Sequence, residues 1–134
     1  LRIADLNLPF DISVDASDYA VAGFLSQSDA TGVEHPLAFF SCKLSESQRA
    51  WATVHKEAYA VLVGLRKFRN WIFGSEMIHV YSDHNPLTFL TESAPKNAKL
   101  MRWSLALQEF NLSFHYIKGR LNVAPDCLSR MGPD

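Results

Sequence analysis

The chain has 134 residues, of which 48% are hydrophobic and 20% are charged, and its formal net charge is −1. Length and composition predict one ordinary globular domain over 1–134. They exclude a membrane-spanning chain, because no apolar run approaches the roughly 20 residues that cross a bilayer. The two cysteines, Cys42 and Cys127, have no metal-ligand spacing and indicate no disulfide framework, which favours a reducing compartment.

Charge is distributed unevenly along the chain. Residues 1–34 hold six acids and one base, whereas residues 95–130 hold six bases and two acids. A basic half beside an acidic half is compatible with a polyanionic ligand held near a metal site. A solvated surface of uneven charge would give the same pattern, so both readings stay open. The start, LRIADLNLPF, lacks a secretory signal pattern and predicts a protein that is not secreted.

The first third of the chain predicts three antiparallel strands. Apolar Phe10, Ile12 and Val14 alternate with polar residues, which indicates a strand. Further strands are expected over 19–27 and 34–41, joined by a hairpin loop over 28–32. Connections this short favour an antiparallel meander.

The rest of the chain alternates helices and strands. The Ser-x-x-Gln pattern from Ser45 predicts a capping box, which opens one long helix that ends before Gly74. The elements expected after it are a strand over 76–81, a helical turn over 86–90, a helix over 96–109, a strand over 112–116, a turn over 118–120 and a helix over 125–130. Strands joined through helices can lie parallel, so the fold class is α/β with a mixed five-stranded sheet.

Acidic residues stand where a site is expected in such a sheet. Asp15 ends the first strand and Asp83 ends the fourth, and ligands bind beyond the carboxyl ends of parallel strands. If these strands are neighbours, their tips are about 5 Å apart. Each aspartate alone could instead be a turn residue or a helix cap.

Two further acids join this set. Glu57 has Val54, Ala60 and Val61 as helical neighbours, so it lies at the buried stripe, where a carboxylate needs a partner or a cation. Lys56 is expected to face solvent instead. Asp126 opens the last helix, where an acid is also favoured by the helix dipole alone.

Four carboxylates in one pocket repel one another unless a cation is present. Oxygen ligands with few His or Cys residues point to two Mg²⁺ ions, or to Mn²⁺. Two such ions about 4 Å apart can activate a water molecule and stabilise a departing phosphate-ester oxygen. The basic half would then hold a phosphodiester backbone, and its candidate contacts are Lys99, Arg102, Lys118 and Arg120.

Five stretches together resemble the ribonuclease H domain of long-terminal-repeat retrotransposons of the Ty3/gypsy type, from Phe10 to Arg130. They are VDASDYAVAGFLSQ (14–27), HPLAFFSCKLSESQRAWATVHKEAYAVLVGLRKFRNWIFG (35–74), YSDHNPL (81–87), RWSLALQEFNLSFHYIKGRLN (102–122) and DCLSR (126–130). The resemblance implies a ribonuclease H-like sheet, three antiparallel strands followed by parallel ones, flanked by helices.

The resemblance also implies a function. Asp15, Glu57, Asp83 and Asp126 would be the catalytic, metal-binding acids of an endonuclease that cleaves the RNA strand of RNA·DNA hybrids. The 2′-hydroxyl groups of the RNA strand would allow the enzyme to distinguish RNA from DNA. The domain would lie in a polyprotein between reverse transcriptase and integrase regions, with 1–8 as a linker remnant and 131–134 as a tail. We expect the isolated domain to be monomeric. We expect the protein to be intracellular, either in the cytoplasm within a virus-like particle or in the nucleus.

Two departures from the family pattern concern the C-terminal segment. Pro125 stands where the family has alanine before the last aspartate, so we expect the last helix to begin there. The loop KGRLN carries Arg120 where many ribonucleases H have a histidine, which predicts slower product release or proton transfer.

Other functions remain in competition. A non-catalytic domain of a host-adopted or remnant retroelement is the main alternative, and retention of all four acids argues against it. A transposase or integrase of similar topology would carry its glutamate on a late helix. A proofreading exonuclease would carry Asp-x-Glu in its first strand, where this chain reads Asp15-Ala16-Ser17.

Overall fold

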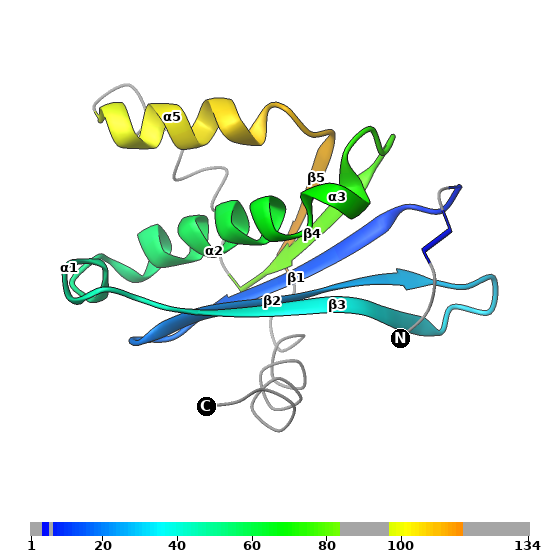
Figure 1. Ribbon diagram of the computed structural model, residues 1–134, viewed down its shortest axis with the longest axis horizontal. Coiled ribbons are helices and arrows are strands. Elements are labelled where there is room, and N and C mark those ends of the chain that lie inside the picture. Colours follow the sequence, from blue (N-terminus) through cyan, green and yellow to red (C-terminus); the bar gives the residue numbers. More distant parts are fainter. Residues whose placement is uncertain (1–3, 6, 84–96, 117–134) are drawn as a thin grey trace.

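Five strands form one mixed sheet, with the described helices packed on one side of it (Figure 1). The computed structural model describes residues 4–5, 7–83 and 97–116. The strand order is β3-β2-β1-β4-β5, so β1 lies at the centre between an antiparallel and a parallel half. The predicted fold class is therefore confirmed.

The antiparallel half is a meander of three long strands. They are β1 (Phe10–Ala16), β2 (Ala20–Ser28) and β3 (Glu34–Lys43). The β1–β2 pairing places Asp15 opposite Ala22, so the carboxyl end of β1 lies beside the start of β2. The β2–β3 hairpin turns through Gly32, whose φ of 86° is one that glycine adopts without steric cost.

The parallel half adds β4 (Ile78–Ser82) and β5 (Leu112–Tyr116). β4 pairs in parallel with β1, and β5 pairs in parallel with β4. The helical connections predicted between these strands make that arrangement possible. As a result, the carboxyl ends of β1, β4 and β5 meet at one edge of the sheet.

The single long helix expected after Ser45 is wrong, because the chain forms three helices there. They are α1 (Glu46–Arg49), α2 (Thr53–Lys67) and α3 (Arg69–Ile72). The capping box at Ser45 is present, but it opens only α1. The backbone is extended at Ala52, and Trp51 packs its ring on His55 in the first turn of α2, 4.3 Å between centroids. Packing of Trp51 therefore accompanies the break.

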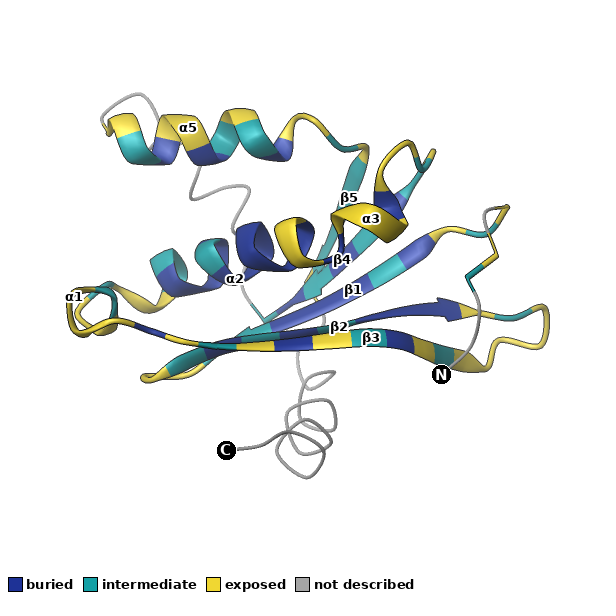
Figure 2. Cartoon of the chain, viewed as in Figure 1, coloured by how far each residue is buried: buried dark blue, intermediate teal, exposed yellow. Residues whose placement is uncertain are grey.

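The core lies between the sheet and α2. Ile12 and Val14 of β1 meet Val61 and Leu65 of α2, and all are at most 1% exposed. Figure 2 shows buried residues along both β1 and α2. Gly23 of β2 is needed for this approach. A Cβ atom there would lie 2.6 Å from the carbonyl oxygen of Ser13 and 2.7 Å from Cε1 of Phe40.

A further helix, α5 (Ala98–Leu107), packs beside α2. Trp103 of α5 is 8% exposed and contacts Trp51 and Tyr59, so it belongs to the core. None of the helices in the described ranges is long and apolar enough to cross a membrane. The elements expected over 86–90, 118–120 and 125–130 lie outside the described residues.

Candidate active site at the carboxyl ends of β1 and β4

Asp15 and Asp83 stand level with each other on neighbouring strands. The printed register pairs Ser13 with Tyr81, and continuing it by two residues on each strand brings Asp15 beside Asp83. Adjacent strands are about 4.8 Å apart. The sheet therefore brings together the two aspartates that the sequence placed at strand ends, and both are partly buried.

Glu57 reaches the same edge from the first half of α2. Its side chain is 1% exposed, as its position on the buried stripe predicts. The backbone amide of Ala16 donates to Oε1 of Glu57 at 3.2 Å, and the hydroxyl of Ser82 donates to Oε2 at 3.2 Å. The carboxylate thus lies between the carboxyl ends of β1 and β4, next to Asp15 and Asp83.

The pKa of Glu57 reports how crowded this edge is. The pKa of Glu57 is raised from 4.5 to about 7, mainly by burial and also by the negative charges of Asp15 and Asp83, while the hydrogen bonds from Ser82 and Ala16 act in the opposite direction. Burial and like charges both disfavour the ionised form. A carboxylate with a pKa raised in this way is a recognised sign of a functional site.

The three carboxylates offer the hard oxygen donors that Mg²⁺ and Mn²⁺ prefer. Oδ1 of Asp83 is buried and has no hydrogen-bond donor among the described residues, which is the situation that a bound cation would relieve. Within these residues, no group of three or more His, Cys, Asp or Glu side chains could hold a metal ion by itself. The fourth predicted acid, Asp126, lies outside the described residues. The type of donor atom therefore fits a divalent metal, while the described side chains do not complete a metal site by themselves.

Two polar residues of α2, Lys56 and His55, are less exposed than residues on a solvent-facing helix surface. Lys56 is 6% exposed instead of solvated, and its ammonium lies 3.9 Å from Oδ1 of Asp18 in the β1–β2 turn. His55 is partly buried between Trp51 and Trp103. The pKa of His55 is lowered to about 4, mainly by burial and also by the positive charge of Lys99. Lys56 therefore lies against the β1–β2 turn, whereas His55 lies against α5.

The predicted phosphate contacts differ in their surroundings. The ammonium of Lys99 lies 4.0 Å above the ring of Trp51, a cation–π contact that holds it against the helix pair. Arg102, on the next turn of α5, is exposed. Lys118 and Arg120 lie outside the described residues.

The Ser82 hydroxyl was not predicted as part of the site. Ser82 is 2% exposed and precedes Asp83, and its side chain faces α2 together with Ile78 and Val80. The available signal was a polar residue at the last inward position of a strand whose other inward residues are apolar. Alternation along the strand shows which face it occupies, but only the fold shows that Glu57 stands opposite.

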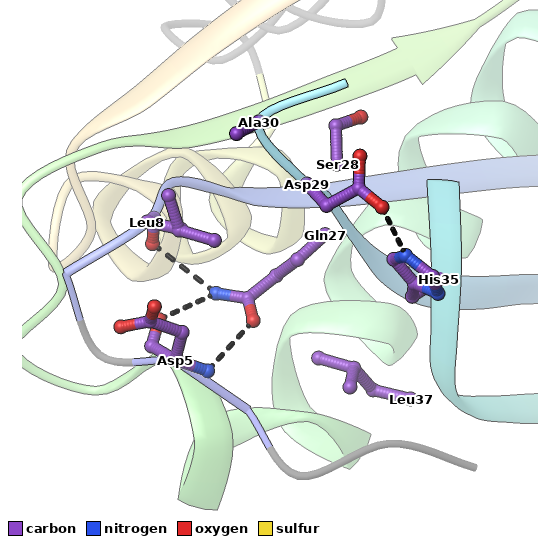
Figure 3. A pocket seen from close by; sticks show the side chains of 8 residues that line it. All are labelled: Asp5, Leu8, Gln27, Ser28, Asp29, Ala30, His35 and Leu37. Carbon is purple, nitrogen blue, oxygen red and sulfur yellow. Dashed lines mark hydrogen bonds and ion pairs between the residues drawn. The ribbon is translucent and has the colours of Figure 1, made fainter. Parts of the chain in front are cut away.

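A separate cavity of about 420 Å³ lies at the other end of the sheet (Figure 3). Its lining residues come from the β2–β3 hairpin and from the segment before β1. The amide of Gln27 is satisfied by the backbone of Asp5 and Leu8, and Nε2 of His35 lies 2.6 Å from Oδ2 of Asp29. Hydrogen bonds from Thr31 and then His35 hold the pKa of Asp29 well below its usual range. These contacts explain the hairpin without invoking a ligand.

The model of the RNase H-like domain found in reverse transcriptase matches residues 5–110. The Pol polyprotein of transposon opus from Drosophila melanogaster is 39% identical over 93% of this chain, and that of transposon gypsy is 33% identical over 97%. The Tf2-3 polyprotein of Schizosaccharomyces pombe is 34% identical over 98%. The chain spans only 12%, 12% and 10% of these relatives, respectively.

Solved structures share the fold at lower identity. The foamy viral protease–reverse transcriptase in complex with an RNA/DNA hybrid matches 86% of this chain and 16% of its own, with a TM-score of 0.66 and 19% identity. LC11-RNase H1 in complex with an RNA/DNA hybrid matches 89% of this chain and 92% of its own, with a TM-score of 0.60 and 16% identity. Sheet order and family match agree, and the chain belongs to the RNase H-like domains of reverse transcriptases, with relatives in the Pol polyproteins of gypsy-type transposons.

Proposed function

We propose that this domain is a metal-dependent endonuclease that cleaves the RNA strand of RNA·DNA hybrids during retrotransposon reverse transcription. The observation that carries the proposal is the buried carboxylate of Glu57, held next to Asp15 and Asp83 at the edge where β1 and β4 end. A structural role alone does not account for it, because a buried carboxylate beside two others destabilises the fold.

Asp15, Glu57 and Asp83, together with Asp126, would hold two Mg²⁺ or Mn²⁺ ions. Bound ions of this kind lower the pKa of a coordinated water molecule and stabilise the charge on a departing oxygen. Of the chain's own groups, Ala16 and Ser82 orient the carboxylate of Glu57 through their hydrogen bonds. Arg102 and Lys99 of α5 offer positive charge for the phosphodiester backbone.

Substrate supply would depend on the rest of the polyprotein. The domain has a net charge of −1, so its own attraction for a nucleic acid is weak. Adjacent reverse transcriptase and integrase regions would raise the effective concentration of hybrid at the site. The solved complexes with RNA/DNA hybrids support this choice of ligand through the shared fold.

A cleavage assay tests the proposal. The 134-residue chain is incubated with an RNA·DNA hybrid labelled on the RNA strand, beside RNA·RNA and DNA·DNA duplexes, with Mg²⁺, with Mn²⁺ or with EDTA. We expect cleavage of the RNA strand in the hybrid alone, with 3′-hydroxyl and 5′-phosphate ends, and none in EDTA. If the chain binds the hybrid but cleaves it with neither Mg²⁺ nor Mn²⁺, the result would support the non-catalytic alternative instead.

A further inference from the structure

We propose that Ser82 is a positioning residue for Glu57, whose hydroxyl holds the glutamate in the orientation that divalent metal binding requires. This inference rests on the proposed function, because it assigns Ser82 a role in the same carboxylate site. Ser82 touches neither substrate nor metal in this account. It acts through Glu57.

The contact between the two side chains is shielded from solvent. The Ser82 hydroxyl donates to Oε2 of Glu57 at 3.2 Å, and the two residues are 2% and 1% exposed. Water therefore has little access to replace the hydroxyl as donor. A hydrogen bond to a charged group in such surroundings is stronger than a neutral one in water.

The hydroxyl is one half of a clamp on Glu57. Each carboxylate oxygen accepts from a different strand, Oε1 from the Ala16 amide of β1 and Oε2 from Ser82 of β4. The Ala16 donor belongs to the backbone and persists in any variant. Ser82 is the side-chain half, so a substitution there tests the clamp directly.

A clamp is needed because the neighbours of Glu57 repel it. Asp15 accepts from the same Ala16 amide as Glu57, and Asp83 directly follows the Ser82 that donates to Glu57, so both aspartates lie close to its carboxylate. The glutamate side chain has three rotatable bonds, so in the absence of a donor it can turn its charge away from the two aspartates. The Ser82 hydroxyl favours the rotamer in which Glu57 remains beside them.

The hydrogen bond leaves Glu57 able to bind a metal. A carboxylate oxygen has two lone pairs, so Oε2 can accept from Ser82 and still coordinate a cation. Groups that orient metal ligands in this way typically change metal affinity by about 10–100-fold when they are removed. The same range is expected for Ser82.

Mn²⁺ binding to the 134-residue chain, followed by electron paramagnetic resonance in the absence of nucleic acid, tests the assignment. We expect Ser82→Ala to weaken Mn²⁺ binding about 10–100-fold. Ser82→Thr keeps a hydroxyl and should bind within about threefold of wild type. Circular dichroism establishes that each variant is folded, and Ser82→Cys, close in size to serine but a weak donor, replaces Ser82→Ala if that variant does not fold.

Ser26→Ala is the matched control. Ser26 is also a fully buried strand serine, and its hydroxyl donates to Oε1 of Glu34 at 2.6 Å, far from the carboxylate edge. It should bind Mn²⁺ like wild type. Equal Mn²⁺ affinity of folded Ser82→Ala and wild type would overturn the positioning role alone. Failure of wild type itself to bind Mn²⁺ would contradict the proposed function, and the inference with it.

Discussion

The carboxylates of Asp15 and Glu57 share one hydrogen-bond donor, the backbone amide of Ala16. The amide nitrogen lies 2.9 Å from Oδ1 of Asp15 and 3.2 Å from Oε1 of Glu57. A single amide thereby joins an acid of β1 to an acid of α2, which come from distant parts of the chain. Because two like charges this close repel each other, the stability of the fold should depend on pH.

We predict that the metal-free domain loses stability as Glu57 ionises. The pKa of Glu57 is raised from 4.5 to about 7, so between these values the folded state binds more protons than the unfolded state. The free energy of unfolding therefore falls as pH rises through this window. Glu57→Gln removes this effect, so its stability relative to wild type should rise between about pH 4.5 and 7 and should level off above that, by up to about 3 kcal/mol in total.

Urea unfolding in EDTA at several pH values between 4 and 8 measures this difference. Glu46→Gln is the control, because Glu46 is an exposed glutamate in α1, away from the carboxylate edge. Its stability difference from wild type should show no comparable rise. A difference between Glu57→Gln and wild type that stays constant with pH would contradict the assignment.

A second prediction concerns the close approach at Gly23. Gly23→Ala places a methyl group 2.6 Å from a backbone oxygen of β1, which cannot move without disturbing the sheet. We expect a loss of about 1–3 kcal/mol in the free energy of unfolding, the usual range for overpacking. Urea denaturation measures this loss. A variant as stable as wild type would show that the sheet can move to accommodate the methyl group.

Gly64→Ala provides the comparison. Its Cβ atom would lie 3.2 Å from Cε1 of Phe40, a ring edge that can shift slightly. Alanine also gains about 1 kcal/mol over glycine inside a helix. These effects oppose each other, so Gly64→Ala should be less destabilising than Gly23→Ala.

The salt dependence of hybrid binding should distinguish the basic residues of α5. Arg102 is exposed, whereas the ammonium of Lys99 lies against Trp51. We predict that Arg102→Gln weakens binding and lowers the slope of log K against log salt by roughly one, and that Lys99→Gln lowers it less. Fluorescence anisotropy in EDTA measures affinity without cleavage.

The double variant Lys118→Ala, Arg120→Ala extends this test to the C-terminal bases. Loss of both phosphate contacts should reduce the slope by about two. Unchanged affinity and slope in all of these variants would mean that the basic half is only a solvated surface and that the hybrid binds elsewhere.

The sequence was sufficient to predict the sheet and most of the carboxylate edge. Alternation from Phe10 to Asp15 predicted β1, and helical phase predicted that Glu57 is buried. Both are local, periodic signals. The register that sets Asp15 level with Asp83 follows from parallel pairing, which the connecting helices made the expected topology.

The burial of Lys56 could not be predicted in the same way. Helical phase describes one buried stripe, whereas Lys56 is buried from outside that stripe, with its ammonium 3.9 Å from Asp18 of the β1–β2 turn. The break before α2 is a second such case, because Trp51 there contacts Trp103 of α5. Such contacts depend on how distant elements meet, and no local pattern encodes them.

The central claim is that the carboxylates at the carboxyl ends of β1 and β4 carry out metal-dependent cleavage. The measurement that tests it most directly is the rate of RNA-strand cleavage in an RNA·DNA hybrid with Mg²⁺, compared between wild type and Asp83→Asn. Asp18→Asn is the control, since Asp18 is an aspartate whose side chain is 90% exposed in the nearby turn. Thermal unfolding establishes that both variants are folded.

We predict that Asp83→Asn is at least as stable as wild type in metal-free buffer, because one of three repelling charges is gone. Its cleavage rate should fall by about a hundredfold or more, the scale at which catalytic groups act, while Asp18→Asn keeps most of the wild-type rate. Cleavage by folded Asp83→Asn at the wild-type rate would contradict the account.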